Sequence, residues 1–529
     1  MDALVLVVSI GLVLLGGGVL SQRARWPLPL VLIGFGILAG FLPFLRGIAL
    51  PPELVLLLFL PALLYWESLN TSLREIRANL RTILLLSIVL VIATATVVAI
   101  VGHAFGLSWP MAIALGAILS PTDATAVSSF IGKLPRRSDT IARAESLLND
   151  GTALVIYALA VGAAVSGTPI EPGPAVLRFF ESYVFGALIG LAVGFAVAGI
   201  RRVLGPSRVL HTTMSLLTPF LAYLPAEALG VSGVVSVVVC GLLLSYFGPR
   251  IVSAAMREQS YQFWQFATYV LNGALFVLIG LELHPLMGEL GSDWVEALVL
   301  GLLSAVVILA VRLAWSNTVP YLIRIVDRRP VQRTLRIGFR QRFPLAWAGF
   351  RGAVSLAAAL ALPTETAAGD PLPGRDVVIG VTFVVILFTL VVQGLPMKAI
   401  VRWARFPEDP REFDEELLAE QTLLERSLAK LPELTEQTST SEEAAAAVRA
   451  DLEHRLSLIH REEGHPEVAQ HDDDESAAEQ SLRLAIMEVK RNALVDLRNR
   501  GRIDDVILRR VQARLDLEEL RLTGPPEEE

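Results

Sequence analysis

The stretch 110–131 reads PMAIALGAILSPTDATAVSSFI, an apolar segment interrupted near its centre by Ser120-Pro121-Thr122-Asp123. It is long enough to cross the hydrocarbon core of a bilayer, which takes about 20 residues of helix. Proline removes a backbone donor and clashes with the preceding turn. Broken backbone at membrane depth is tolerated only where protein buries it or where it lines a cavity. The stretch therefore predicts a membrane protein with a broken helix in its interior.

Apolar runs of this length recur through most of the 529 residues, of which 53% are hydrophobic and 18% charged. Soluble domains are nearer one quarter charged, and a transmembrane β-barrel would show short alternating segments instead. We therefore predict an all-α polytopic membrane protein. About 13 spans satisfy the length criterion, approximately at 3–20, 27–45, 52–69, 82–106, 110–131, 140–166, 176–203, 211–229, 231–248, 257–283, 294–323, 338–364 and 376–403.

The basic residues of the loops predict the orientation, because lysine and arginine accumulate on the cytoplasmic side. Alternate loops are rich in them: Arg23 and Arg25; Arg74, Arg77 and Arg81; Lys133, Arg136 and Arg137; Arg201, Arg202 and Arg208; Arg250 and Arg257; and 324–342. The intervening loops carry few. We expect a multi-pass protein of the cell membrane, with its N-terminus outside and its C-terminus in the cytoplasm.

The charge divides the chain near Phe406. Residues 406–529 hold 16 basic and 32 acidic residues, against 29 basic and 20 acidic in the part before them. We expect a transmembrane domain at 1–405 and an acidic, helical tail at 406–529 that could regulate it. An acidic tail argues against nucleic acid as a partner. The single cysteine, Cys240, excludes a disulfide framework.

Acidic residues lie where hydrocarbon would be expected: Glu67, Asp123 and Asp150 in apolar stretches, with Glu145 near Asp150. A charge at the bilayer centre costs about 2.5–3.5 kcal/mol on insertion scales. A chain does not accumulate such costs without a use for them. Facing carboxylates suit a small cation or a proton, so the pattern indicates an ion carrier.

The spacing suggests how an ion would be held. Ser146 and Asp150 share one face of a helix, and hard cations prefer oxygen ligands. Asp150, Glu67, Ser146 and the Thr122 carbonyl could bind Na⁺, Li⁺ or K⁺ if three spans converge. Proton and cation would then compete for one site. Thr122 and Ser146 could instead bond to their own helices, and Asp123 could cap the helix beside Pro121.

Arg351 lies within the twelfth predicted span and needs a partner there. We predict an ion pair with Glu145 that holds the broken helices together. Glu227 and Arg312, also near or within spans, are expected to make interfacial or structural pairs, with gating as the alternative.

Three motifs resemble the monovalent cation:proton antiporter family, in the branch with an Asn-Asp pair at the ion site: residues 145–153 (ESLLNDGTA), 120–124 (SPTDA) and 351–357 (RGAVSLA). Residues 60–67 (LPALLYWE) match the family's third span, and the likeness covers roughly 1–405. It implies inverted repeats, a dimerisation domain and a mobile core domain. It also implies Asp150 as the ion and proton site, Asn149 as support for the crossed helices, Glu67, Thr122 and Ser146 around the ion, and Asp123 at the helix break. The Asn-Asp form suggests electroneutral exchange.

The expected function is exchange of a monovalent cation, Na⁺ first, for protons by alternating access, in pH homeostasis. The expected partners are the cation, H⁺ and membrane lipid. The resemblance adds a homodimer, and no cofactor is expected. Potassium/proton exchange is the main alternative. A cation channel would show filter loops or rings, and an enzyme would show a motif such as HExxH, GxSxG or Walker A; none of these is present.

The tail predicts helices broken at Pro432, at 438–440 and at 464–466, with an amphipathic segment at 481–522. Four of the seven histidines lie in it: His454, His460, His465 and His471. A pH sensor is conceivable, but a linker and a small helical domain are the simpler interpretation. His465 and His471 flank Asp472-Asp473-Asp474, without the spacing of a strong metal motif. The tail's partner stays open.

Overall fold

A computed structural model gives the fold. It describes residues 2–42, 52–123, 130, 136–169, 171–205, 207–290, 294–326, 338–406, 410–460 and 477–523. In these ranges the regular secondary structure is helical, and the pairing of Glu365 with Pro371 is an isolated bridge. The expected all-α class is confirmed.

The membrane helices form two groups that pack mainly within themselves. The first group contains α1 (Asp2–Ala24), α2 (Leu28–Gly40), α3 (Pro52–Asn70), α9 (Pro172–Val203), α10 (Arg208–Ala228), α11 (Gly233–Ile251) and α12 (Ala254–Leu290). The second contains α4 (Leu73–Leu84), η1 (Leu85–Leu90), α5 (Val91–Ala104), α6 (Trp109–Leu119), α8 (Arg136–Ser166), α13 (Trp294–Val326), α15 (Phe339–Trp347), α16 (Ala353–Leu360), α17 (Arg375–Phe388), η2 (Thr389–Gln393) and α18 (Met397–Ala404). One large apolar core joins the groups.

The helices follow the apolar runs. A helix, or an interrupted helix, lies at each predicted span. Among the described residues, seven helices are long and apolar enough to cross a membrane by length and composition. The exact number of 13 stays a prediction. Large apolar side chains on the outer faces of these helices are exposed, among them Leu12, Phe185 and Phe195. Such faces suit contact with lipid.

The break predicted at Pro121 is confirmed, and two other proline and glycine positions behave differently from each other. α6 ends at Leu119, before Pro121. Gly230 separates α10 from α11 with a φ of +70°, in the left-handed region that glycine adopts at no steric cost. Pro61 lies inside α3 and does not end it.

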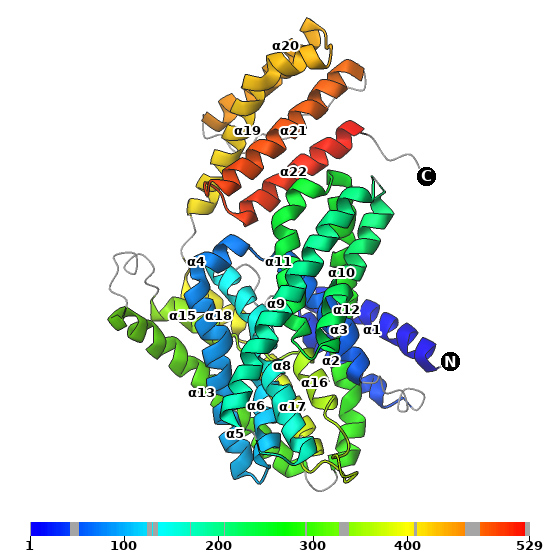
Figure 1. Cartoon of the computed structure of the whole chain (residues 1–529), viewed down its shortest axis with the longest axis vertical. Coiled ribbons are helices and arrows are strands. Elements are labelled where there is room, and N and C mark those ends of the chain that lie inside the picture. The colour runs from blue at the N-terminus through cyan, green and yellow to red at the C-terminus, as the bar shows by residue number, and fades with distance from the viewer. Residues whose placement is uncertain are drawn as a thin grey trace.

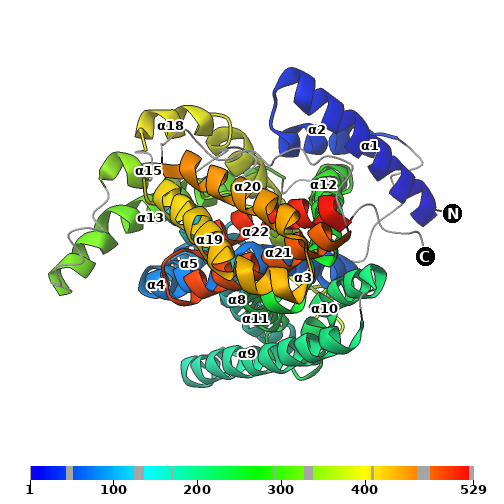
Figure 2. The ribbon, with the colours of Figure 1, turned by 90° about the horizontal axis from the view of Figure 1, so that it is seen from above.

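The tail forms a helical unit at one end of the molecule, over the middle of the membrane helices (Figures 1 and 2). Its helices are α19 (Pro410–Gln437), α20 (Glu442–His460), α21 (Ala477–Asn499) and α22 (Asp505–Thr523). The amphipathic segment becomes α21 and α22, whose apolar residues face α19.

The predicted tail breaks have different outcomes. The break at 438–440 is confirmed, and Ser439 has a φ of +52° there. The break at Pro432 is wrong, because α19 continues through it. Leu431 and Leu434 on either side pack in the tail core, which offsets the lost hydrogen bond. The break at 464–466 and the stretch 465–474 with its histidines lie outside the described residues.

Candidate ion-binding site

Two non-helical segments meet inside the bundle: residues 120–123 after α6, and 348–352 between α15 and α16. Their backbones touch, since the Asp123 N–H donates to the Phe350 carbonyl at 2.9 Å. Gly352 permits this approach, because a Cβ there would lie 1.8 Å from Asp123 Oδ2. The first break was predicted from Pro121, whereas the second was not.

The buried side chain of Arg351 stabilises the contact between these two non-helical segments. It is 2% exposed, and its guanidinium donates to the carbonyls of Leu119 (2.8 Å), Ser120 (3.3 Å) and Gly349. The first two belong to the end of α6, where carbonyls lack helical partners and a cation is favourable. The predicted ion pair of Arg351 with Glu145 is wrong. Arg351 satisfies broken backbone instead.

Glu145 has another partner, Arg312 of α13. Arg312 Nη1 lies 2.5 Å from Glu145 Oε1, and the two side chains are 12% and 6% exposed. Arg312 also donates to the Leu345 carbonyl of α15 at 3.3 and 3.4 Å. The pair ties α8 to α13 and α15, and the expectation that Arg312 forms a pair is confirmed.

Thr122 joins the first break to α8. Asn149 Nδ2 donates to Thr122 Oγ1 at 2.9 Å, and Ser146 Oγ donates to the Thr122 carbonyl at 3.0 Å. The Thr122 hydroxyl lies 3.5 Å from Glu145 Oε1, to which it donates. These hydrogen bonds join the segment 120–123 to α8. The alternative, in which Thr122 and Ser146 bond only to their own helices, is therefore wrong.

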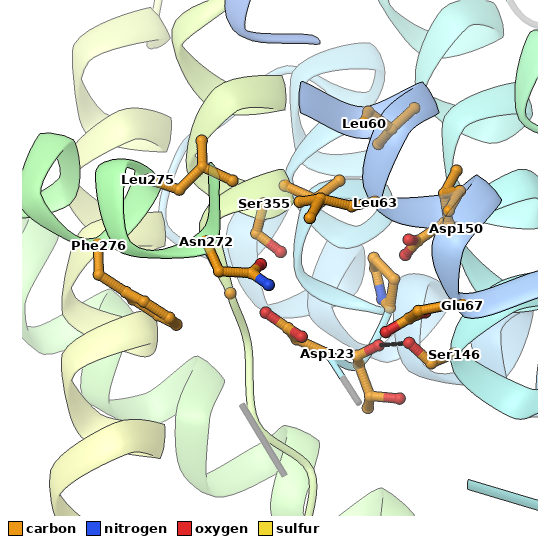
Figure 3. A pocket seen from close by; sticks show the side chains of 15 residues that line it. Leu60, Leu63, Glu67, Asp123, Ser146, Asp150, Asn272, Leu275, Phe276 and Ser355 are labelled. Atoms are coloured by element: carbon orange, nitrogen blue, oxygen red, sulfur yellow. Dashed lines mark hydrogen bonds between the residues drawn. The ribbon is translucent and has the colours of Figure 1, made fainter. Parts of the chain in front are cut away.

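The predicted carboxylates line one pocket (Figure 3). Glu67 comes from α3 of the first group, while Asp123, Ser146 and Asp150 come from the second. Asp150 is 8% exposed and lies within electrostatic range of Glu67 and Asp123. Within the described residues, the carboxylates of Glu67 and Asp150 make no hydrogen bond or ion pair. Two acids, Asp150 buried and Glu67 partly buried, are thus left available in one pocket.

Other lining residues carry polar groups that the sequence did not single out: Asn272 of α12 and Ser355 of α16. Asn272 is the one amide in the stretch 269–281, which is otherwise mostly apolar, and this was the available signal. Ser355 lies within the quoted 351–357 motif. Oxygen atoms of carboxylate, hydroxyl and amide groups are what a hard cation prefers.

A second cavity extends from this pocket on the side of the tail. Glu67, Leu63 and Asn272 line both cavities, and Asn70 and Arg143 line the second alone. Asn70 lies at the end of α3 that contacts the tail, through its carbonyl and Arg509. The pocket is therefore approached from the tail side.

Comparison with known proteins agrees with this architecture. Residues 10–403 match the family model described as "Sodium/hydrogen exchanger, transmembrane". An uncharacterised Na⁺/H⁺ exchanger of Mycobacterium tuberculosis is 41% identical over 99% of this chain and 97% of its own length. The Na⁺/H⁺ antiporter ApNhaP of Aphanothece halophytica is 32% identical, over 79% of this chain and 78% of its own.

More distant proteins are also similar. A sodium, potassium, lithium and rubidium/H⁺ antiporter of Bacillus subtilis is 28% identical over 94% of this chain and 75% of its own length. The structure of the sodium proton antiporter MjNhaP1 from Methanocaldococcus jannaschii superposes with a TM-score of 0.56 at 17% identity, covering 77% of this chain and all of that one. That likeness concerns the fold. With a family match across the membrane helices and relatives alike over nearly the whole length, the chain belongs to the sodium/hydrogen exchanger family of cation:proton antiporters.

Proposed function

We propose that the protein exchanges monovalent cations, Na⁺ first and Li⁺ with it, for protons across the cytoplasmic membrane. The carrying observation is the pocket in which the buried Asp150 and the partly buried Glu67 lie without a hydrogen bond to their carboxylates among the described residues. An unpaired carboxylate in such a place is costly. Binding either a proton or a cation removes the uncompensated charge, and only one of them fits at a time.

In this mechanism Asp150 holds the proton or the cation. Glu67, Ser146 and the Thr122 carbonyl contribute oxygen ligands when the cation is bound, and Asp123 lies at the helix break beside them. Asn149 holds Thr122 in place. One carboxylate exchanging one H⁺ for one cation would be electroneutral. Asn149 at the position beside Asp150 supports this, because it brings no second titrating group.

Alternating access would come from movement of the second helix group against the first. The pocket lies between them, since Glu67 and Asn272 belong to the first group and Asp150 to the second. The Glu145–Arg312 pair lies within the second group, and so do the carbonyls that Arg351 holds. These contacts would keep the second group rigid as it moves.

We further propose the membrane orientation that the loop charges indicate, with the N-terminus outside and the tail in the cytoplasm. The observed cavity would then open to the cytoplasm. Homodimerisation through the first group is part of the proposal, supported by its exposed apolar faces. A role in pH homeostasis would follow from the exchange itself.

Purified protein in proteoliposomes tests the cation. With a pH dye inside, an inward gradient of Na⁺ or Li⁺ is expected to drive proton efflux that saturates, whereas K⁺ drives little. The name of the Bacillus subtilis relative keeps K⁺/H⁺ exchange as a second candidate, and equal rates with K⁺ would favour it. A conductive cation current without proton coupling would instead indicate a channel and contradict the proposal.

The tail, 406–529, is proposed to regulate the transmembrane part, 1–405, by restraining the movement of its helix groups. It contacts both groups. In the second, Ser72 at the start of α4 donates to Asp504 (3.0 Å) and Asp505 (2.8 Å). In the first, Arg257 of α12 donates to both carboxylate oxygens of Asp516, at 2.9 and 2.5 Å.

Asp516→Asn is expected to raise the initial rate of cation-driven proton movement severalfold, because it removes the charge that Arg257 holds and loosens the tail from the first group. Glu479→Gln is the matched control, since Glu479 pairs with Arg483 in its own helix. Rates are compared in the same vesicles. An unchanged rate in Asp516→Asn would contradict restraint by docking, and a lower rate would show that the tail supports transport.

A further inference from the structure

Another pocket, separate from the two cavities described above, lies on the tail side of the membrane helices and has the composition of an anion site. It lies among the ends of α9, α10, α11 and α12. Its described lining contains three basic side chains and no acidic one: Arg201, Arg202, Gly205, His211, Phe247, Ile251, Ser253 and Met256. None of these residues belongs to the ion pocket.

No acidic side chain pairs with Arg201 among the residues that the structure describes. Within the described part of the chain it makes no ion pair and no hydrogen bond, and its Nε is buried without a partner. A buried unsatisfied donor costs roughly 1–3 kcal/mol, and more when charged. The accumulation of positive charge on the cytoplasmic side accounts for the exposed Arg202, but it does not account for burying the Nε of the partly exposed Arg201 without a partner.

His211 is a second unsatisfied group in the same pocket. It is 3% exposed, and its Nε2 donates to the Gly205 carbonyl at 3.1 Å. Its other ring nitrogen, Nδ1, is buried and has no partner among the described residues. The first turn of α12, at Ser253 and Met256, adds N–H groups that have no partner within the helix, and this helix end favours negative charge.

The surroundings favour a lipid as the source of the anion. Val203 and Val209, on the two helices that flank Gly205, are 85% and 66% exposed, and Ile200 beside Arg201 is 46% exposed. Apolar side chains this open suit acyl chains. Basic pockets between membrane helices on the cytoplasmic side bind anionic headgroups in other proteins.

We propose that this pocket binds the phosphate group of an anionic phospholipid. Arg201 and Arg202 pair with the phosphate, and N–H groups at the start of α12 donate to it. The Nε2–H of His211 is used by the Gly205 carbonyl, so this ring donates to the phosphate from Nδ1 only as the imidazolium, with both nitrogens protonated. The acyl chains lie along α9 and α10. A headgroup held here anchors the first helix group at the membrane surface. The inference does not depend on which ion is exchanged.

Native mass spectrometry of the delipidated full-length protein tests it, with phosphatidylglycerol and phosphatidylcholine of the same acyl chains. The protein is expected to bind phosphatidylglycerol in preference, and each arginine removed, Arg201→Gln or Arg202→Gln, is expected to weaken that binding roughly fivefold. Arg178→Gln, an exposed arginine at the other end of α9, is the matched control and should change nothing.

Two kinds of result would overturn the lipid proposal. No preference for phosphatidylglycerol, or equal binding by Arg201→Gln, Arg202→Gln and Arg178→Gln, would overturn the proposal. Inorganic phosphate that raises the melting temperature alone, without a lipid preference, would show a free phosphate site and overturn the lipid source. If Arg201→Gln fails to fold, Arg202→Gln carries the same expectation, since its side chain is exposed. Lipid binding is measured without transport, so failure of the exchange proposal leaves it untouched.

Discussion

Asp150→Asn is expected to reduce cation-driven proton movement to the level of empty vesicles, for every cation tested. Asparagine keeps the shape of the side chain but can neither release a proton nor offer a full negative charge to a cation. Both half-reactions therefore lose their site. The measurement is the pH-dye assay in proteoliposomes, with gel filtration to show that the variant is folded.

Two further variants make this result specific. Asp376→Asn, at the exposed start of α17, removes a carboxylate that is 51% exposed and outside the pocket, and it should retain the parent rate. Glu67→Gln should keep proton coupling but need more cation for half-maximal rate, because one oxygen ligand loses its charge. Full exchange by Asp150→Asn would refute competition of proton and cation at Asp150. Glu67 and Asp123 would then become the candidates for the shared site.

Much of the fold could be predicted because the local amino-acid composition identifies each membrane span. Apolar runs of about 20 residues predict helices one by one, and Pro121 among polar neighbours predicted the break after α6. The break at 348–352 could not be predicted, since glycines such as those at 349 and 352 are common in membrane helices and the nearest proline, Pro344, lies inside α15. A glycine needed for close approach to Asp123 becomes apparent only when both segments are in place.

In the candidate site, too, some features could be predicted from the sequence and others could not. The carboxylates could be predicted because charge in an apolar run is conspicuous, and they do line one pocket. Their assignment to an ion stays a prediction. Partners across the fold could not be predicted, because two arginines within predicted spans, Arg312 and Arg351, were both available to Glu145. Which guanidinium meets a carboxylate and which meets broken backbone depends on how the helices cross. Asn272 was overlooked because a single amide is a weak signal.

The two arginines also predict different responses to mutation. Glu145→Gln leaves Arg312 buried without its counter-charge, and removing one partner of a buried pair typically costs about 3–5 kcal/mol. Arg312→Gln leaves Glu145 in the same condition. The double variant Glu145→Gln/Arg312→Gln removes both charges and can keep a hydrogen bond. We expect it to be more stable than the sum of the single losses, as measured by thermal unfolding in detergent.

The control double-mutant cycle combines Glu145→Gln with Arg351→Gln. The Arg351 guanidinium holds the carbonyls of Leu119, Ser120 and Gly349, and no change at Glu145 gives those carbonyls a donor. Arg351 shares no hydrogen bond with Glu145 and feels its charge only through space, so Arg351→Gln should lose nearly as much stability alone as in the Glu145→Gln background. Residues paired directly show large coupling energies, so the coupling at Glu145–Arg351 is expected to be well below that at Glu145–Arg312. A coupling energy at Glu145–Arg351 as large as that at Glu145–Arg312 would contradict the pairing described here, and with it the distinct role of Arg351 as the donor that closes the end of α6.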